Sequence, residues 1–279
     1  MAGTAGRVGL VLARASQVLG EEAYYHEFLE GLERVLTPAG TSVLVRVVPD
    51  RAAETAVYQR WSAERRVDGV ILVDLTPSDE RVALVKRLEL PAVVIGDPST
   101  ADGLPTVWTD DAGFAREAVS FLSGLGHRLI AQVSGPTSFA HTQLRRSGFR
   151  AESEAHGLLL VQVEGDYSYD AGLTATSSLL AAPERPTALV FDNDVMAIGG
   201  LQAIADRGLS VPADVSVVAW DDSPLCQLAT PALSAMSHDV GRIGELAAMA
   251  LSDAMSGRPA EVYEAPPAHI VVRESTVGG

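Results

Sequence analysis

Short apolar runs alternate with amphipathic stretches along the chain, and this alternation constrains the fold more than any other feature. Val215 to Ala219 is one such run, too short for a helix and apolar like a strand that is covered on both faces. Strands of this kind, separated by helices, are typical of parallel sheets with helices on both sides. The sequence therefore predicts the α/β fold class.

The same pattern gives an order of elements that forms two series of strand and helix. A loop rich in Asp, Gly, Pro, Ser and Thr at 97–106 precedes the last strand and helix of the first series. We expect strands at 7–13, 42–48, 69–73, 92–96, around 107, and at 129–133, 159–164, 188–191, 215–219, near 262 and at 270–273. We expect helices at 22–36, 51–66, 78–88, 112–125, 143–156, 170–180, 194–206 and 239–256.

Composition indicates a chain that folds on its apolar core alone. With 279 residues, 47% of them hydrophobic, it has enough material for two lobes of ordinary domain size. Its one cysteine, Cys226, excludes an internal disulfide and a cysteine-rich metal site, and the six histidines show no metal-ligand spacing. We therefore expect neither a metal nor a cofactor.

The N-terminal residues 1–6 lack the basic segment and apolar stretch of a secretory signal, and no apolar run is long enough to cross a membrane. We expect a cytoplasmic protein with no membrane partner. The net charge of −15, from 36 acidic and 21 basic residues, opposes binding to a phosphate backbone. These residues alone are therefore not expected to bind DNA well.

The segment 208–222 combines a helix end, a turn, a buried strand and an acidic strand tip. Gly208 is a typical helix stop and Pro212 prevents the helix from continuing. The strand then ends in Trp220, Asp221 and Asp222. Ligands of parallel sheets bind outside the carboxyl ends of the strands, where an aromatic ring and two carboxylates suit a hydroxylated molecule. A helix cap and a solvated acid would be the simpler interpretation.

This segment resembles the effector-binding core of the LacI/GalR family of bacterial transcription regulators. Other segments that resemble the family occur in the same order along nearly the whole chain: 67–72, 90–95, 125–130, 145–149, 193–199 and 272–276. Two positions depart from the family pattern. Ala219 stands where a glycine is usual, and residues 231–236 replace a common Pro-Leu-Thr-Thr form near a crossover between lobes.

The resemblance implies two Rossmann-like lobes with parallel sheets, of the type I periplasmic-binding-protein-like fold, and a ligand cleft between them. It places 7–125 and 240–267 in the N-terminal lobe and 126–239 and 268–279 in the C-terminal lobe. The family's N-terminal helix-turn-helix has no counterpart here, because residues 7–12 already look like the first strand of the core. Operator DNA would then be a partner only through such a missing DNA reader.

The resemblance also implies which residues contact a small effector. The matching positions are Tyr24, Tyr25, Phe139, His141, Arg145, Tyr167, Asn193, Trp220 and Asp221. Adjacent helical residues point about 100° apart, so one tyrosine of the first pair can face the effector while the other packs in the core. Arg145 can grip an anion or a vicinal diol, or it can form a surface ion pair.

The remaining candidates also have two interpretations. His141, expected with Phe139 in the loop after the strand that ends near Ser134, is either a ligand contact or a hydrogen-bonding wall. One of Asn193 and Asp194 should cap the helix that they begin, and we favour Asn193 for effector contact because an amide both donates and accepts. Asp222 should cap the turn that follows it.

The predicted function is therefore that of the ligand-sensing core of a LacI-type regulator, which we expect to be a repressor. Its partners would be a sugar or sugar derivative and a second copy of the chain. Dimer contacts would come from apolar helix faces such as 75–88 and 248–251, although faces of this kind are equally often part of a core. Alternatives are a purine or nucleoside effector, or a secreted solute-binding protein of a transporter. An enzyme is disfavoured, since no nucleophile elbow, phosphate-binding glycine loop or GxGxxG follows the first strand.

Overall fold

The computed structural model describes residues 6–13 and 23–276 and divides the chain into two compact units. Unit 1 comprises Met1–Thr109 and Asp239–Pro266, and unit 2 comprises Asp110–His238 and Pro267–Gly279. Helix α5 (Asp111–Gly124), which the sequence analysis placed in the first lobe, groups with unit 2. The reason is its packing on helix α6 (Ala140–Ala155), where a Cβ at Gly148 would overlap the backbone of Ala112.

Unit 1 is built on a six-stranded parallel sheet in the order β11-β5-β4-β3-β1-β2. Its strands are β1 (Gly6–Ala13), β2 (Thr41–Val48), β3 (Gly69–Leu72), β4 (Ala92–Ile95), β5 (Thr106–Trp108) and β11 (Val262–Glu264). Its helices are α2 (Ala23–Leu36), α3 (Arg51–Ala63), α4 (Glu80–Arg87) and α10 (Val240–Met255), with the short 3₁₀ turn η1 (Pro98–Thr100).

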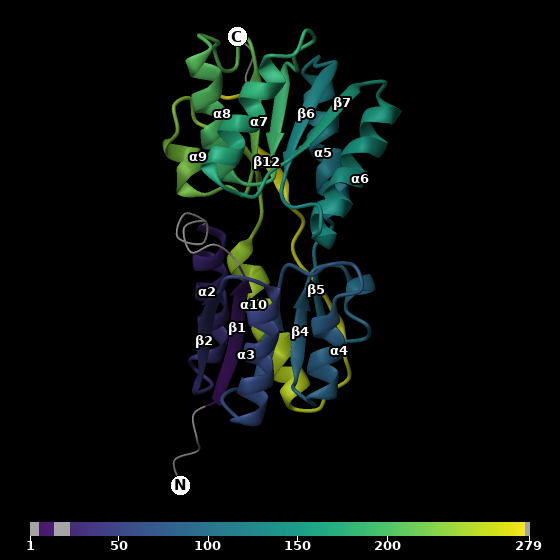
Figure 1. Cartoon of the computed structure of the whole chain (residues 1–279), viewed down its shortest axis with the longest axis vertical. Helices are drawn as coiled ribbons and strands as arrows, with labels where there is room; N and C mark the ends of the chain where they lie inside the picture. Colours follow the sequence, from purple (N-terminus) through teal and green to yellow (C-terminus); the bar gives the residue numbers. More distant parts are fainter. Residues whose placement is uncertain (1–5, 14–22, 277–279) are drawn as a thin grey trace. The chain divides into compact units, whose positions relative to one another are not determined.

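The two faces of this sheet are covered by different helices (Figure 1). Helices α2 and α10 pack together over one face, where Phe28 and Leu32 join Ile243 and Leu251 in a core. Their close approach depends on glycine, because a Cβ at Gly31 would overlap the α10 backbone. Helices α3 and α4 cover the other face with a second core.

A buried ionic network joins α3 and α4 in unit 1. The Arg81 guanidinium donates to Glu54 at 2.6 Å and to Asp79 at 2.8 Å, and all three side chains are at least 97% buried. It also donates to the carbonyl of Asp74, whose backbone is left-handed with φ 53°. Burial opposes the charge on Asp79, yet the Arg81 contacts outweigh it and hold the pKa of Asp79 well below its usual range.

Unit 2 has its own six-stranded sheet in the order β12-β10-β9-β8-β6-β7. Its strands are β6 (Leu129–Ser134), β7 (Leu159–Glu164), β8 (Ala188–Phe191), β9 (Ser216–Trp220), β10 (Ser234–Ser237) and β12 (His269–Val271). Five of them are parallel, and β12 runs antiparallel to β10 at the edge. Its helices are α5, α6, α7 (Tyr169–Leu180), α8 (Asp194–Asp206) and α9 (Pro224–Leu228).

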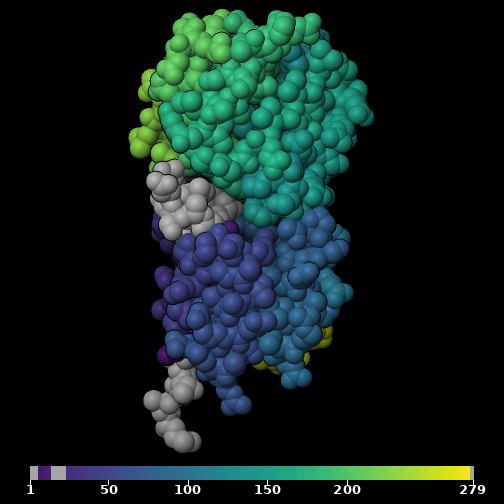
Figure 2. Space-filling model, in the orientation of Figure 1, coloured from purple at the N-terminus to yellow at the C-terminus, as the bar shows by residue number. Residues whose placement is uncertain are grey.

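The helices of unit 2 also pack in pairs. Helices α5 and α6 bury Phe114 and Phe149 against one side of the sheet, while α7 and α8 lie beside each other (Figure 1). A Cβ at Gly172 would overlap the α8 backbone, so this second pair also needs a glycine. In the space-filling view of the same face, side chains close the gaps between the ribbons within each unit (Figure 2).

Three details of the structure bear on what was expected from the sequence. Strand β10 (Ser234–Ser237) lies in a segment where no strand was expected. Its Ser-Ala-Met-Ser sequence is not a recognisable apolar run. Helix α6 begins at Ala140, so His141 lies in its first turn instead of in a loop. The stretches 75–88 and 248–251, suggested as dimer contacts, place most of their apolar residues in the cores of unit 1.

Candidate functional site

The carboxyl ends of three neighbouring strands of unit 2 carry the polar and aromatic residues of the candidate site. Asp192 follows β8, Asp221 follows β9, and His238 follows β10. Trp220 is the last residue of β9 and is fully buried. Because these strands are parallel and adjacent, their ends meet at one edge of the sheet.

Arg145 is the centre of this site. It lies on α6, and its Cζ is 4.3 Å from the centroid of the Trp220 ring. Its Nε donates to Asp111 Oδ1 at 2.7 Å, and one terminal nitrogen donates to the carbonyl of Asp192 at 3.4 Å. The guanidinium is therefore fixed by stacking on one side and by an ion pair on its edge, with 14% of the side chain exposed.

The charges around Arg145 reinforce one another. Burial disfavours the carboxylate of Asp111, but the Arg145 cation outweighs that cost and the pKa of Asp111 is lowered. Burial likewise disfavours the Arg145 cation, but the charges of Asp111 and Asp192, with a smaller contribution from Asp221, raise its pKa. Both groups are ionised at neutral pH, so the pair is a preformed charged element of the site.

Asp192 is a buried carboxylate of the site. Gln132 donates to its Oδ1 at 2.8 Å, and the backbone N–H of Gly135 donates to its Oδ2 at 3.1 Å. Burial raises the pKa of Asp192, although Arg145 opposes that shift. Both carboxylate oxygens are thus engaged, and the residue links the ends of β6 and β8.

Tyr167 provides an aromatic wall. Its hydroxyl lies 2.9 Å from His141 Nε2, and its backbone is left-handed with φ 70°. The ring lies directly against the backbone of Gly135, where a Cβ would overlap the phenol. Glycine at 135 is therefore required for the tyrosine to occupy this position.

Asn193, and not Asp194, caps helix α8. Its extended backbone (φ −153°) lets Oδ1 accept from the N–H of Met196 at 2.9 Å, while Nδ2 donates to the Tyr167 carbonyl at 3.0 Å. The expectation that Asp194, and not Asn193, caps this helix is therefore wrong. Asp194 instead accepts from the Ser223 hydroxyl, and burial raises the pKa of Asp194.

The two aspartates after Trp220 have different environments. Asp221 is left-handed (φ 68°), and its N–H donates to the carbonyl of Met236 at 3.1 Å. Asp222, which was expected to cap the turn that follows it, instead accepts from Arg273 through Oδ2 at 2.8 Å. Ser223 is the cap of α9.

The remaining expected residues lie in two places. Phe139 precedes α6, with its ring 5.5 Å from that of His141. Tyr24 and Tyr25 belong to unit 1, where Tyr25 is buried in the core and donates to Asp74 at 3.1 Å. Tyr24 is half-buried and stacks on Phe28. The structure therefore brings seven of the nine expected residues to unit 2.

His238 belongs to the same site, although no sequence pattern predicted it. Its ring lies 5.5 Å from Phe114 and 5.6 Å from Trp220. Burial, with the Arg145 cation nearby, lowers the pKa of His238 to about 4, so the ring is neutral at pH 7. Within the described chain, His238 Nε2 and Trp220 Nε1 are buried without a hydrogen-bond partner. A bound polar molecule would supply such partners.

The sequence contained a signal for Asp192, one of the three residues that were missed. Asp192 directly follows the apolar strand β8, as Asp221 follows β9, and the same reasoning applies to both positions. Asp111 and His238 had no such signal, because each is identified only by its contacts with residues far along the chain.

Across residues 6–13 and 23–276, no group of three or more His, Cys, Asp or Glu side chains is arranged to hold a metal ion.

None of the described helices is both long enough and apolar enough to cross a membrane.

A family model described as a periplasmic binding protein-like domain matches residues 119–276. The chain is also similar to the ribose operon repressor of Escherichia coli K12. The two are 31% identical over 228 residues, which cover 80% of this chain and 69% of that protein.

Two solved structures are similar over most of the chain. One is a LacI family transcriptional regulator from Bifidobacterium animalis subsp. lactis, with a TM-score of 0.88 and 32% identity. The match covers 96% of this chain and 97% of that one. The other is a complex of the transcriptional regulator CelR with cellobiose, with a TM-score of 0.89 and 28% identity, covering 96% of this chain and 84% of that one.

Proposed function

Because the chain belongs to the LacI family of transcriptional regulators and forms the effector-binding core of such a regulator, we propose that unit 2 binds a sugar or sugar derivative. The effector would lie at the carboxyl ends of β8, β9 and β10. Its relatives are transcriptional regulators and not enzymes, so binding is the activity to be explained. The similarity to a regulator bound to cellobiose supports a sugar.

The fixed position of Arg145 carries this proposal. The Asp111 carboxylate and the Trp220 ring hold the guanidinium in place before any ligand arrives. An arginine held in this way presents its remaining N–H groups in a rigid fork, which suits a vicinal diol or an anionic substituent. Preorganisation lowers the entropy cost of binding.

The other groups supply the mixture of donors and acceptors that a polyol requires. Asp221 is the carboxylate that we assign to accept effector hydroxyl protons. Trp220 Nε1–H can donate to a hydroxyl oxygen, and His238 Nε2 can donate or accept according to its tautomer. Tyr167 and Phe139 offer aromatic surface to the apolar face of a sugar ring.

An effector controls a regulator only if it binds one conformational state more tightly than another. We propose that the whole regulator is cytoplasmic and that operator DNA is its second partner. The net charge of −15 makes this chain a poor surface for direct phosphate contact, so a separate DNA reader would make that contact. We also propose a homodimer, which a molar mass of twice 29.3 kDa in light scattering would support and a monomer mass would contradict.

A ligand screen tests the proposal. Thermal unfolding is measured with monosaccharides, disaccharides, sugar phosphates and nucleosides, since a ligand that binds only the folded state raises Tm. Hits are titrated by calorimetry against wild type and Asp221→Asn, which keeps the side-chain volume and removes the charge. Losing a charged acceptor of buried hydroxyls costs about 2 kcal/mol, or roughly 30-fold in Kd.

Asp170→Asn is the matched control, because Asp170 is exposed at the start of α7. We expect a sugar hit that Asp221→Asn weakens and Asp170→Asn leaves unchanged. A nucleoside hit with the same dependence would keep the site and replace the ligand class. If no compound in the panel raises Tm, the sugar assignment is wrong.

A further inference from the structure

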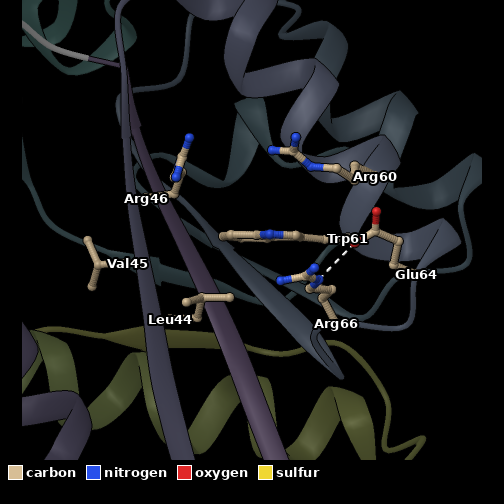
Figure 3. A pocket seen from close by; sticks show the side chains of 7 residues that line it. All are labelled: Leu44, Val45, Arg46, Arg60, Trp61, Glu64 and Arg66. Atoms are coloured by element: carbon tan, nitrogen blue, oxygen red, sulfur yellow. Dashed lines mark hydrogen bonds and ion pairs between the residues drawn. The ribbon is translucent and has the colours of Figure 1, made fainter.

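Unit 1 contains a hollow that shares no residue with the candidate site of unit 2. It lies between the edge strand β2 and helix α3 and has a volume of about 390 Å³ (Figure 3). We call it the arginine pocket, after the residues that dominate its wall. It is lined by Leu44, Val45, Arg46, Arg60, Trp61, Glu64 and Arg66.

Trp61 forms the apolar wall of the arginine pocket. Its ring lies against the backbone of Gly9 in β1, where a Cβ would overlap the indole. Gly9 pairs in register with Leu44 of β2, so the ring covers the sheet next to its outermost strand. Tyr58 packs edge-on behind it, with 6.4 Å between ring centroids, and Trp61 is 5% exposed. These contacts fix the ring in place.

Three cations surround this fixed ring. The guanidinium groups of Arg60 and Arg66 lie on opposite sides of the indole plane, and Arg46 extends from β2 (Figure 3). Glu64 is the one carboxylate in the lining, and it accepts from Arg66 Nε at 2.7 Å. Within the described residues, the guanidinium groups of Arg46 and Arg60 have no hydrogen-bond or ion-pair partner, although both residues bond through their backbones. The local charge is thus positive in a chain whose net charge is −15.

We propose that the arginine pocket is a second ligand site, which binds a small organic dianion carrying a phosphate or carboxylate group. Arg46 and Arg60 would hold the anionic group through charge-assisted hydrogen bonds, which guanidinium groups form with both kinds of oxyanion. The apolar part would contact Leu44 and Trp61. The volume falls in the range of about 300–1,000 Å³ that is typical of small-molecule sites.

Phenyl phosphate is the probe, because it joins a dianion to an apolar ring. Binding is followed by the indole N–H resonances of the three tryptophans in a ¹H–¹⁵N correlation spectrum, with Trp61→Phe used to assign the Trp61 signal. We expect a saturable shift of the Trp61 signal, with weaker binding of inorganic phosphate and none of phenol. No saturable shift at millimolar phenyl phosphate would overturn the proposal.

Paired variants test the role of the arginines. Arg46→Gln with Arg60→Gln is expected to weaken phenyl phosphate binding at least roughly tenfold, the effect of losing one charge-assisted contact or more. Arg87→Gln is the matched control, since Arg87 is an exposed arginine of unit 1 that does not line the pocket. Equal weakening by the control would show nonspecific attraction and reject the site. Arg46, Arg60 and Arg87 are exposed, and circular dichroism checks that each variant is folded before titration.

Discussion

The Arg145 guanidinium lies 4.3 Å from the centre of the Trp220 ring, although the two residues are 75 positions apart in the sequence. This contact couples the tip of β9 to helix α6. Asp111 completes the arrangement by binding the same guanidinium from α5. Three separate segments therefore position one cation, and the site depends on the folding of unit 2 as a whole.

Replacing Arg145 by methionine is expected to lower both effector binding and stability. Asp111 would remain as a buried carboxylate without its partner, which costs about 3 kcal/mol when a buried pair is broken. Urea unfolding measures the stability and calorimetry the binding. Arg145→Met with Asp111→Asn should recover much of the stability without restoring binding. Wild-type stability in the single variant would show that the ion pair is not a structural element.

His238 predicts a specific pH dependence of stability. Its folded pKa of about 4 lies below the usual 6.5, so the unfolded chain binds a proton that the folded chain does not. Its contribution is present above pH 6.5 and is lost as the pH falls towards 4. The ring keeps some solvent access, and we expect about 2 kcal/mol over this window. His238→Gln should flatten the wild-type slope in urea titrations, and an unchanged slope would contradict the assignment.

Asn193→Ala is expected to destabilise unit 2 by about 2 kcal/mol. The cap of α8 contributes about 1 kcal/mol and the bond to the Tyr167 carbonyl a similar amount. Ser168→Ala is the comparison, because Ser168 caps α7 and its other side-chain hydrogen bond, to Asp166, is exposed. The two variants should differ by about 1 kcal/mol in urea unfolding. Equal losses would mean that the bond to Tyr167 contributes nothing.

Arg81→Met is expected to cost about 3–5 kcal/mol, because Glu54 and Asp79 would stay buried without their shared cation. The triple variant with Glu54→Gln and Asp79→Asn removes those charges and should recover part of the loss. Thermal and urea unfolding give both values. Lys86→Met tests an exposed ion pair of the same helix and should cost less than about 1 kcal/mol. A similar loss in both variants would argue against burial as the cause.

Local sequence patterns were sufficient to predict most strands and helices of both units. Each apolar run and each amphipathic stretch is continuous, so its type follows from neighbouring residues. The short helix α9 and strand β10 were the exceptions. In β10, Ser234 and Ala235 are small, and they are buried where the strand pairs with β9 and β12. Its existence depends on pairing between distant segments, which no local pattern encodes.

The candidate site divides in the same way. Trp220 and Asp221 were predictable because Trp220 ends a buried strand and Asp221 directly follows it. The engagement of Asn193 with Tyr167 and the pairing of Arg145 with Asp111 span 26 and 34 residues, and both depend on how helices pack on the sheet. The residues of the site were therefore easier to predict from the sequence than the side chains and carbonyls that they bind.

The antiparallel strand β12 has a consequence for the design of fragments. It comes from the last segment of the chain and pairs with β10, while Ser275 donates to the carbonyl of Val217. A continuous fragment of residues 110–238 would lack both contacts and would expose β10 as an open edge, which favours aggregation. Autonomous expression of unit 2 requires a gene in which His238 is linked directly to Pro267.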